Sequence, residues 1–143
     1  PQIPPNTGNI ARLCAATRCH LSLVGDLGFE LTNKYLKRAG LDYWNYVSWE
    51  HIPDKYEFFE HVPVDQLHLL TVHTNTPYTK VSPKKGDYLF FGKETAGLPK
   101  EWLAQHPERT FTIPMWEKGV RSLNLATAVS IVLYHGLHQQ NLF

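Results

Sequence analysis

The chain has 143 residues, of which 43% are hydrophobic and 19% are charged, and its formal net charge is +1. This balance is typical of one compact globular domain over residues 1–143 and excludes extensive disorder. No apolar run approaches the roughly 20 residues of a membrane helix, and nothing at the start resembles a signal peptide, so we expect a soluble cytoplasmic protein. Because the net charge is near zero, any contact with nucleic acid must come from local patches.

The potential metal ligands are scattered. Cys14 and Cys19 do not form a CxxC pair, so neither a disulfide framework nor a zinc site is predicted. His135 and His138 are three residues apart on a predicted helix, but a polar helix end explains them better than a metal pair does. We therefore expect no metal.

The first half of the chain contains two predicted helices and two β-prone runs. A helix begins at Asn6-Thr7, and the strand Leu21–Val24 stops at Gly25. A second helix is predicted over residues 33–39, with Thr32 as its N-cap and Gly40 closing it. Residues 43–52 are aromatic and β-prone, and Pro53 opens a short helix through about His61.

The second half alternates strands with helices. Strands are predicted over residues 67–72, 88–91 and 110–113, and helices over residues 99–105 and 122–139. This alternation predicts an α/β fold with a mainly parallel sheet flanked by helices.

The last predicted helix is apolar nearly all round. Its first three turns leave little polar surface because they contain Leu123, Leu125, Ala126, Ala128, Val129, Ile131, Val132, Leu133 and Tyr134. Such a helix must be covered on more than one side, and in so small a domain a partner subunit is the expected cover. We therefore predict a homodimer.

Three segments are richer in Gly, Pro, Asn and Arg than packing requires. In residues 4–12, a proline-rich loop is predicted to run into a helix start, with Arg12 in the opening turns. A helix cap beside a surface arginine explains this segment equally well. Residues 91–99 follow a predicted strand, where ligands bind in open α/β sheets, although such a loop is more often a plain turn. No phosphate-binding glycine motif is present there.

The third segment, residues 113–125, joins the last predicted strand to the apolar helix. Ser122 is a good N-cap for that helix, and such a cap is the plain structural explanation of this residue. Trp116 could stack on a base, although a tryptophan more often packs in a core.

The chain contains "IPPNTGNIARLCAAT", "DYLFFGKETAGLP" and "IPM…RSLNLATAVSIVLY", in this order and spacing, and also "LKRAGLDYW". This ordered set resembles the signature motifs of the SPOUT methyltransferase superfamily. The chain is most similar to the tRNA (cytidine or uridine-34)-2′-O-methyltransferase family, over nearly its whole length.

The resemblance implies a C-terminal deep trefoil knot, bound S-adenosyl-L-methionine, a homodimer, and methylation of the wobble nucleotide in the anticodon stem-loop of tRNA. It assigns catalytic roles to Arg12, Arg121 and Asn124. The positions implied for the cofactor are Leu70, Gly92, Glu94, Gly97, Ile113, Met115, Ser122 and Leu123. For RNA contacts we propose Asn9, Lys34, Lys37 and Arg38, although a solvated helix face explains any single lysine equally well.

The chain departs from the family pattern at several points. Related sequences begin with a β-strand ahead of "PEIPPNTGN", and this first strand is absent here. Lys93 and Ala96 replace a proline and an arginine of "GPETRGLP", and His135 stands where an acidic residue is common.

Two alternatives remain open. One is a ribose methyltransferase acting on ribosomal RNA; such relatives usually carry an extra RNA-binding domain, which this sequence lacks. The other is a catalytically silent RNA-binding or dimerisation module of the same fold, against which the joint presence of the motif residues argues. A guanidinium rarely gives up its proton, so for Arg12 we favour electrostatic stabilisation of the reacting hydroxyl and leave a role as base open.

Overall fold

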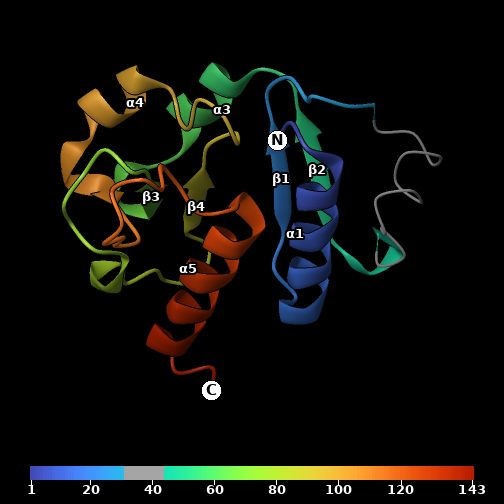
Figure 1. Ribbon diagram of the computed structural model, residues 1–143. Coiled ribbons are helices and arrows are strands. Elements are labelled where there is room, and N and C mark those ends of the chain that lie inside the picture. Colours follow the sequence, from blue (N-terminus) through green and yellow to red (C-terminus); the bar gives the residue numbers. More distant parts are fainter. Residues whose placement is uncertain (31–43) are drawn as a thin grey trace. The chain divides into compact units, whose positions relative to one another are not determined.

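The computed structural model describes residues 1–30 and 44–143. The chain divides into two compact units, Pro1–His61 and Val62–Phe143, which are described separately (Figure 1). The predicted helix over residues 33–39 lies outside the described residues. Within the described part of the chain, no helix is both long enough and apolar enough to cross a membrane.

The first unit contains a helix followed by a pair of parallel strands. Its elements are α1 (Pro4–Thr17), β1 (Leu21–Val24), the 3-10 helix η1 (Trp44–Tyr46), β2 (Trp49–Ile52) and α3 (Lys55–His61). Strands β1 and β2 pair in parallel, from Leu21 opposite Trp49 to Val24 opposite Ile52. The β1 prediction is confirmed, and so is α3, whose first turn is capped by the carboxylate of Asp54 accepting from the amides of Tyr56 and Glu57.

Helix α1 begins earlier than its sequence predicts. It starts at Pro4 instead of Asn6, because a proline is tolerated in the first helical turn, where its missing amide hydrogen has no partner to lose. Two consequences follow. Asn6 and Thr7 are buried inside the helix, and Arg12 lies in its third turn, so the expectation that Arg12 stands in the opening turns was wrong.

The second unit contains a three-stranded parallel sheet with the order β4-β3-β5. The strands are β3 (Leu67–Leu70), β4 (Tyr88–Phe91) and β5 (Thr110–Phe111), and the α-helices are α4 (Lys100–Gln105) and α5 (Leu125–Gln139). Three 3-10 helices connect them: η2 (Val64–Gln66), η3 (Tyr78–Lys80) and η4 (Pro107–Arg109). The predicted parallel α/β architecture is confirmed.

Helices cover both faces of this sheet. On one face, Val132 of α5 packs with Leu70, Val81 and Phe111, while Leu89, Phe91 and Ile113 lie at the margin of the cluster. On the other face, the ring of Phe90 meets Trp102 of α4 edge-on, with a centroid distance of 6.0 Å. Alternate β4 side chains thus point to opposite faces, and central β3 is buried along its whole length.

Helix α5 lies close to the loop that precedes β4. A Cβ atom at Gly136 would approach the Pro83 ring to 2.9 Å, so a glycine here permits the contact. At the preceding residue, the ring of His135 meets Tyr78 edge-on, with a centroid distance of 5.3 Å. His135 is therefore a packing residue of the second unit, and the expectation of a plain polar helix end was wrong for this position.

Candidate functional site

The three strands of the second unit end side by side. Leu70 pairs with Phe91 on one side and with Phe111 on the other, so the carboxyl ends of all three strands lie level at one edge of the sheet. Ligands of open α/β sheets bind at such an edge. The structure therefore brings together Leu70, Gly92 and Ile113, which the sequence assigned to one site.

The loop after β4 is a tight turn made possible by two glycines. The Gly97 amide donates to the Lys93 carbonyl at 3.0 Å, and Gly97 has a φ of +69°, a left-handed conformation that suits glycine. A Cβ atom on Gly92 would lie 2.0 Å from the Gly97 carbonyl carbon and 2.2 Å from the Leu98 nitrogen. The room left by Gly92 is thus taken by the loop's own backbone, whereas the sequence suggested that a ligand would fill it. Glu94 is half-buried in this turn.

The loop after β3 is fastened to β5 by backbone hydrogen bonds. The Thr71 amide donates to the Phe111 carbonyl at 2.9 Å, and the Thr112 amide donates to the Thr76 carbonyl at 2.8 Å. The Tyr78 amide donates in turn to the Thr112 carbonyl at 2.7 Å. The loop after β3 and the start of the loop after β5 are therefore held at a fixed spacing.

The third loop, residues 112–124, differs from its prediction where it meets α5. The helix begins at Leu125, and its N-cap is Asn124, whose side-chain oxygen accepts from the Thr127 amide at 3.2 Å. Ser122 was expected to be the N-cap, and that expectation was wrong. Ser122 and Arg121 are exposed loop residues instead, while Met115 and Leu123 are half-buried.

The remaining predicted residues belong to the first unit. Asn9 and Arg12 are exposed on α1, and their spacing of three places them on one face together with exposed Pro5 and Ala16. The proposed RNA contacts Lys34, Lys37 and Arg38 lie outside the described residues.

The thiol of Cys14 does not have the character of a nucleophile. Both cysteines are free, and Cys14 is buried in α1. Burial, with a smaller contribution from Cys19, raises the pKa of the Cys14 thiol to about 12, so the thiolate needed for attack is scarce at neutral pH. Among residues 1–30 and 44–143, no three His, Cys, Asp or Glu side chains are arranged to hold a metal ion.

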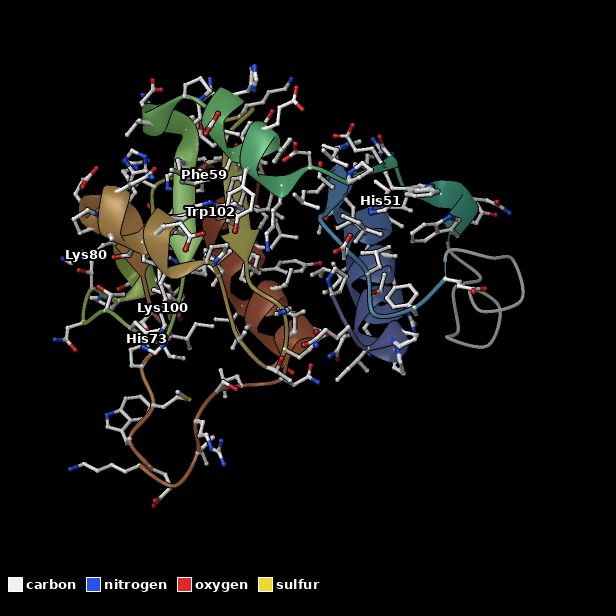
Figure 2. All side chains as sticks on the ribbon, turned by 90° about the horizontal axis from the view of Figure 1, so that it is seen from above. His51, Phe59, His73, Lys80, Lys100 and Trp102 are labelled. Atoms are coloured by element: carbon white, nitrogen blue, oxygen red, sulfur yellow. The ribbon has the colours of Figure 1, made fainter. Side chains whose placement is uncertain are left out.

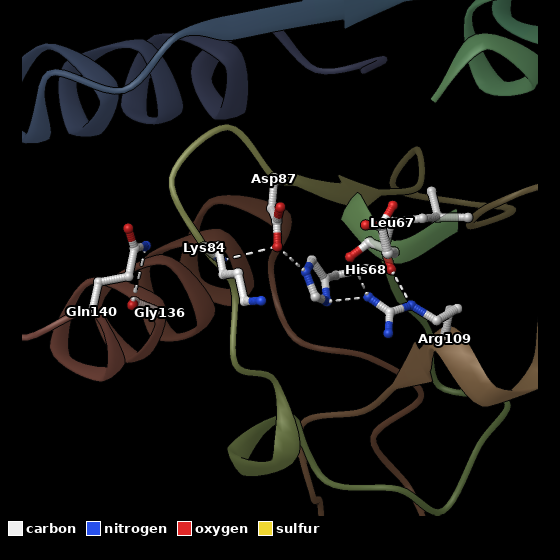
Figure 3. Close-up of polar contacts among 8 residues, drawn as sticks. Leu67, His68, Lys84, Asp87, Arg109, Gly136 and Gln140 are labelled. Atoms are coloured by element: carbon white, nitrogen blue, oxygen red, sulfur yellow. Dashed lines mark hydrogen bonds and ion pairs between the residues drawn. The ribbon is translucent and has the colours of Figure 1, made fainter. Parts of the chain in front are cut away.

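A buried polar network at the opposite edge of the sheet was not predicted (Figure 3). His68 Nε2 lies 2.9 Å from Asp87 Oδ2, with only 5% and 8% of the two side chains exposed. Arg109 Nη2 lies 3.4 Å from His68 Nδ1, and Arg109 Nε donates to the Leu67 carbonyl at 2.7 Å. Because a guanidinium only donates, Nδ1 must accept, and His68 is the neutral tautomer that donates from Nε2 to Asp87.

The pKa of His68 agrees with this assignment. Burial lowers it below its ordinary value of 6.5, and the charge of Arg109 lowers it further, against the raising effects of Asp87. The network joins the segments that enter β3, β4 and β5, so its role is to hold the sheet. A histidine inside the otherwise apolar run Leu67–Leu70 was the one signal in the sequence that could have revealed it.

Comparison with known proteins places the chain in a family. The model of the SpoU rRNA Methylase family matches residues 1–134. A tRNA (cytidine(34)-2′-O)-methyltransferase of Yersinia pestis is 43% identical over 97% of this chain and 89% of its own length. A solved structure concerned with the 2-OH methylation of C/U34 on tRNA is 40% identical, with a TM-score of 0.89, and the match covers 100% of this chain and 93% of that chain.

A more distant solved structure shares the fold. It is an AdoMet-bound rRNA methyltransferase from Sinorhizobium meliloti, 25% identical with a TM-score of 0.78, and the match covers 95% of this chain and 52% of that chain. The family model spans nearly the whole sequence, and the identity to the Yersinia enzyme extends over almost all of both chains. The chain therefore belongs to the SpoU rRNA methylase family.

Proposed function

We propose that the protein transfers the methyl group of S-adenosyl-L-methionine to the ribose 2′-hydroxyl of nucleotide 34, the wobble nucleotide of tRNA. The observation that carries this function is the 43% identity to the Yersinia tRNA (cytidine(34)-2′-O)-methyltransferase over 97% of the chain. The relative that acts on rRNA is only 25% identical, which favours tRNA over ribosomal RNA as the substrate.

The residues at the carboxyl edge of the second unit fit S-adenosyl-L-methionine. A Cβ atom on Gly97 would meet nothing within 4 Å, so the turn after β4 is open on that side and a flat adenine can approach its backbone there. Half-buried apolar side chains lie in the loops that follow β5, at Ile113, Met115 and Leu123, and Leu70 ends the central strand. Glu94 and Ser122 are polar groups on these loops that can hydrogen-bond a ribose or an amino acid end. When bound, the cofactor supplies an electrophilic methyl group.

For Arg12 we propose an electrostatic role. A 2′-hydroxyl loses its proton as it attacks, and the negative charge that develops on its oxygen is stabilised by a preorganised donor. A guanidinium donates from five N–H groups and does not act as a base at neutral pH. The exposed face shared by Asn9 and Arg12 on α1 is suited to contacting a large polyanionic substrate.

Arg121 and Asn124 have separate proposed roles near the third loop. Arg121 is exposed and can approach a phosphate or the reacting ribose. Asn124 uses its side-chain oxygen to cap α5, which places its proposed catalytic role at the first residue before that helix.

The proposal includes finer features of the assembly. We expect residues 1–143 to act as one methyltransferase domain with a C-terminal trefoil knot, and two copies to form the working homodimer. The anticodon stem-loop is the expected partner, and the cytoplasm, where tRNA is used, is the expected location. The match of one family model to residues 1–134 supports the single domain.

The function is tested by transfer of a labelled methyl group from S-adenosyl-L-methionine to total tRNA, followed by nuclease digestion and mapping of the modified nucleotide. We expect label on the ribose of nucleotide 34. A transcript with 2′-deoxyribose at that nucleotide should remain unlabelled. Label in ribosomal RNA but not in tRNA would favour the rRNA alternative, and absence of S-adenosylhomocysteine binding by calorimetry would favour a silent module.

A further inference from the structure

The side chain of Trp116 is far more exposed to water than is favourable for a large apolar ring. Its relative exposure is 90%, the highest of any large hydrophobic side chain in residues 1–30 and 44–143. Trp102 of the same unit is only 4% exposed and packs on Phe90. Leaving a whole indole in water forfeits the free energy that its burial would contribute, which favours a role in binding a partner.

The turn that follows Trp116 is built by its own hydrogen bonds. The Glu117 carbonyl accepts from the Val120 amide at 3.2 Å, and the Glu117 carboxylate accepts from the Gly119 amide at 2.9 Å. The loop shape therefore does not depend on packing of the indole. Trp116 directly precedes this turn, and its side chain is open to solvent.

Basic residues lie on the three loops at the carboxyl edge of the sheet, one of which contains Trp116. The segments 71–80, 92–100 and 112–124 contain five Lys or Arg and two Glu, an excess of three positive charges in a chain whose total is +1. The five are Lys80, Lys93, Lys100, Lys118 and Arg121. Figure 2 shows the labelled His73, Lys80 and Lys100 on one side of the second unit, from which segment 112–124 extends.

An exposed aromatic ring beside cations is suited to one class of partner. Proteins bind single-stranded RNA by stacking unpaired bases on aromatic side chains and holding the adjacent phosphates with Lys or Arg. The centres of protein–protein interfaces are, in contrast, depleted in Lys and Glu, and both residue types directly follow Trp116, as Glu117 and Lys118.

We propose that the segment 114–121 binds the anticodon loop of tRNA, with Trp116 stacking on an unpaired base beside the methylated nucleotide and Lys118 contacting a neighbouring phosphate. This inference rests on the proposed function, because it takes the target ribose to lie at the carboxyl edge of β3, β4 and β5. In this proposal Trp116 raises the affinity for the RNA substrate and takes no part in the methyl transfer.

The test compares Trp116→Ala, Trp116→Phe and Trp116→Leu in the full chain. KM for a synthetic anticodon stem-loop should rise roughly tenfold or more for Ala and Leu, the scale of one lost base stack, while Phe retains most of the affinity. The kcat at saturating RNA and the affinity for S-adenosylhomocysteine should stay within about twofold of wild type. Tyr46→Ala, at an exposed aromatic outside the three loops, is the matched control.

A second arm tests the phosphate contact. Lys118→Gln should weaken stem-loop binding at low salt and reduce the slope of log affinity against log salt by about 1, whereas Trp116→Ala should leave that slope nearly unchanged.

If the wild-type protein methylates nucleotide 34 and Trp116→Ala has the same KM, the stacking proposal is overturned while the proposed function stands. If Trp116→Ala loses affinity for the stem-loop and changes the oligomeric state, and Trp116→Leu restores both, then Trp116 contacts a second copy of the protein instead. A wild-type protein that neither binds the stem-loop nor methylates tRNA would overturn both.

Discussion

At the scale of single residues, Gly92 is constrained by its own loop. We expect Gly92→Ala to lower the free energy of unfolding by roughly 2 kcal/mol or more, because the new Cβ would displace the backbone at Gly97 and Leu98. Chemical denaturation measures this change, and affinity for S-adenosylhomocysteine should fall with it. Gly119→Ala is the control, since its Cβ would meet only the flexible Glu117 carboxylate, at 3.3 Å. Lost affinity with unchanged stability would instead indicate direct contact between position 92 and the cofactor.

Arg12 is the residue whose role belongs to the transition state. Arg12→Ala should lower turnover by about a hundredfold or more, the scale seen when one preorganised donor is lost. Its position on the exposed face of α1 means that folding and cofactor affinity should change little. Arg12→Lys separates two roles, because lysine keeps the charge but loses the planar fork, so partial rescue would favour charge over bidentate positioning. Methylation by Arg12→Ala at the wild-type rate would remove Arg12 from the mechanism.

At the scale of elements, the start of α5 joins a structural role to a proposed catalytic one. Asn124→Ala should cost about 1 kcal/mol of stability through the lost cap on the Thr127 amide. Asn124→Ser keeps a capping oxygen but removes the amide, so it should restore stability. Thermal unfolding and methyl transfer measured on both variants distinguish the roles. Activity that returns with serine would show that Asn124 acts only as a cap.

The His68 network gives the second unit a pH-dependent stability. Because burial lowers the pKa of folded His68, the unfolded chain binds more protons at this site, and the free energy of unfolding should decrease as pH falls below about 6.5. Above that pH this contribution is fully present. Urea denaturation between pH 5 and 8 measures the slope, and His68→Gln, which can still donate to Asp87 but does not titrate, should reduce it. The exposed His73→Gln is the control, and an unchanged slope in His68→Gln would contradict the assignment.

The elements that the sequence predicted well are those defined by local pattern. Strands Leu21–Val24 and Tyr88–Phe91 have the predicted bounds because short apolar runs are ended by glycine. The α5 boundary was missed because two capping residues stand close together, and the side chain that reaches the Thr127 amide is Asn124, not Ser122. The His68 network was missed because Asp87 and Arg109 are distant in sequence and meet only where parallel strands begin.

The same limit applies to the candidate site. The positions Leu70, Gly92 and Ile113, which the motifs placed in one site, lie at one edge because loops that follow parallel strands meet there, and their role in binding stays a prediction. The contact between Gly92 and the Gly97–Leu98 backbone depends on the path of one turn, which glycine content alone does not specify. The exposure of Trp116 likewise depends on the path of its loop, which the residue type alone does not specify.

At the scale of the whole molecule, charge and apolar surface are unevenly distributed. The net charge of +1 conceals an excess of three positive charges on the three loops at the carboxyl edge. Exposed apolar side chains gather around the end of α5 instead, where Tyr134 is 45% and Phe143 69% exposed and their rings lie 6.2 Å apart. The two surfaces suit different partners, a polyanion and a second copy of the chain.

The last prediction concerns that second surface. If α5 contributes to a two-fold interface through the exposed Tyr134, then Tyr134→Glu would introduce a charge into that interface twice in each dimer. We expect the dissociation constant to rise at least tenfold, measured by sedimentation equilibrium at micromolar concentration. Thr127→Glu, exposed in the first turn of the same helix, adds the same charge where the helix dipole favours it and should leave assembly unchanged. A wild-type monomer at these concentrations, or a Tyr134→Glu dimer as tight as wild type, would show that α5 is covered in another way.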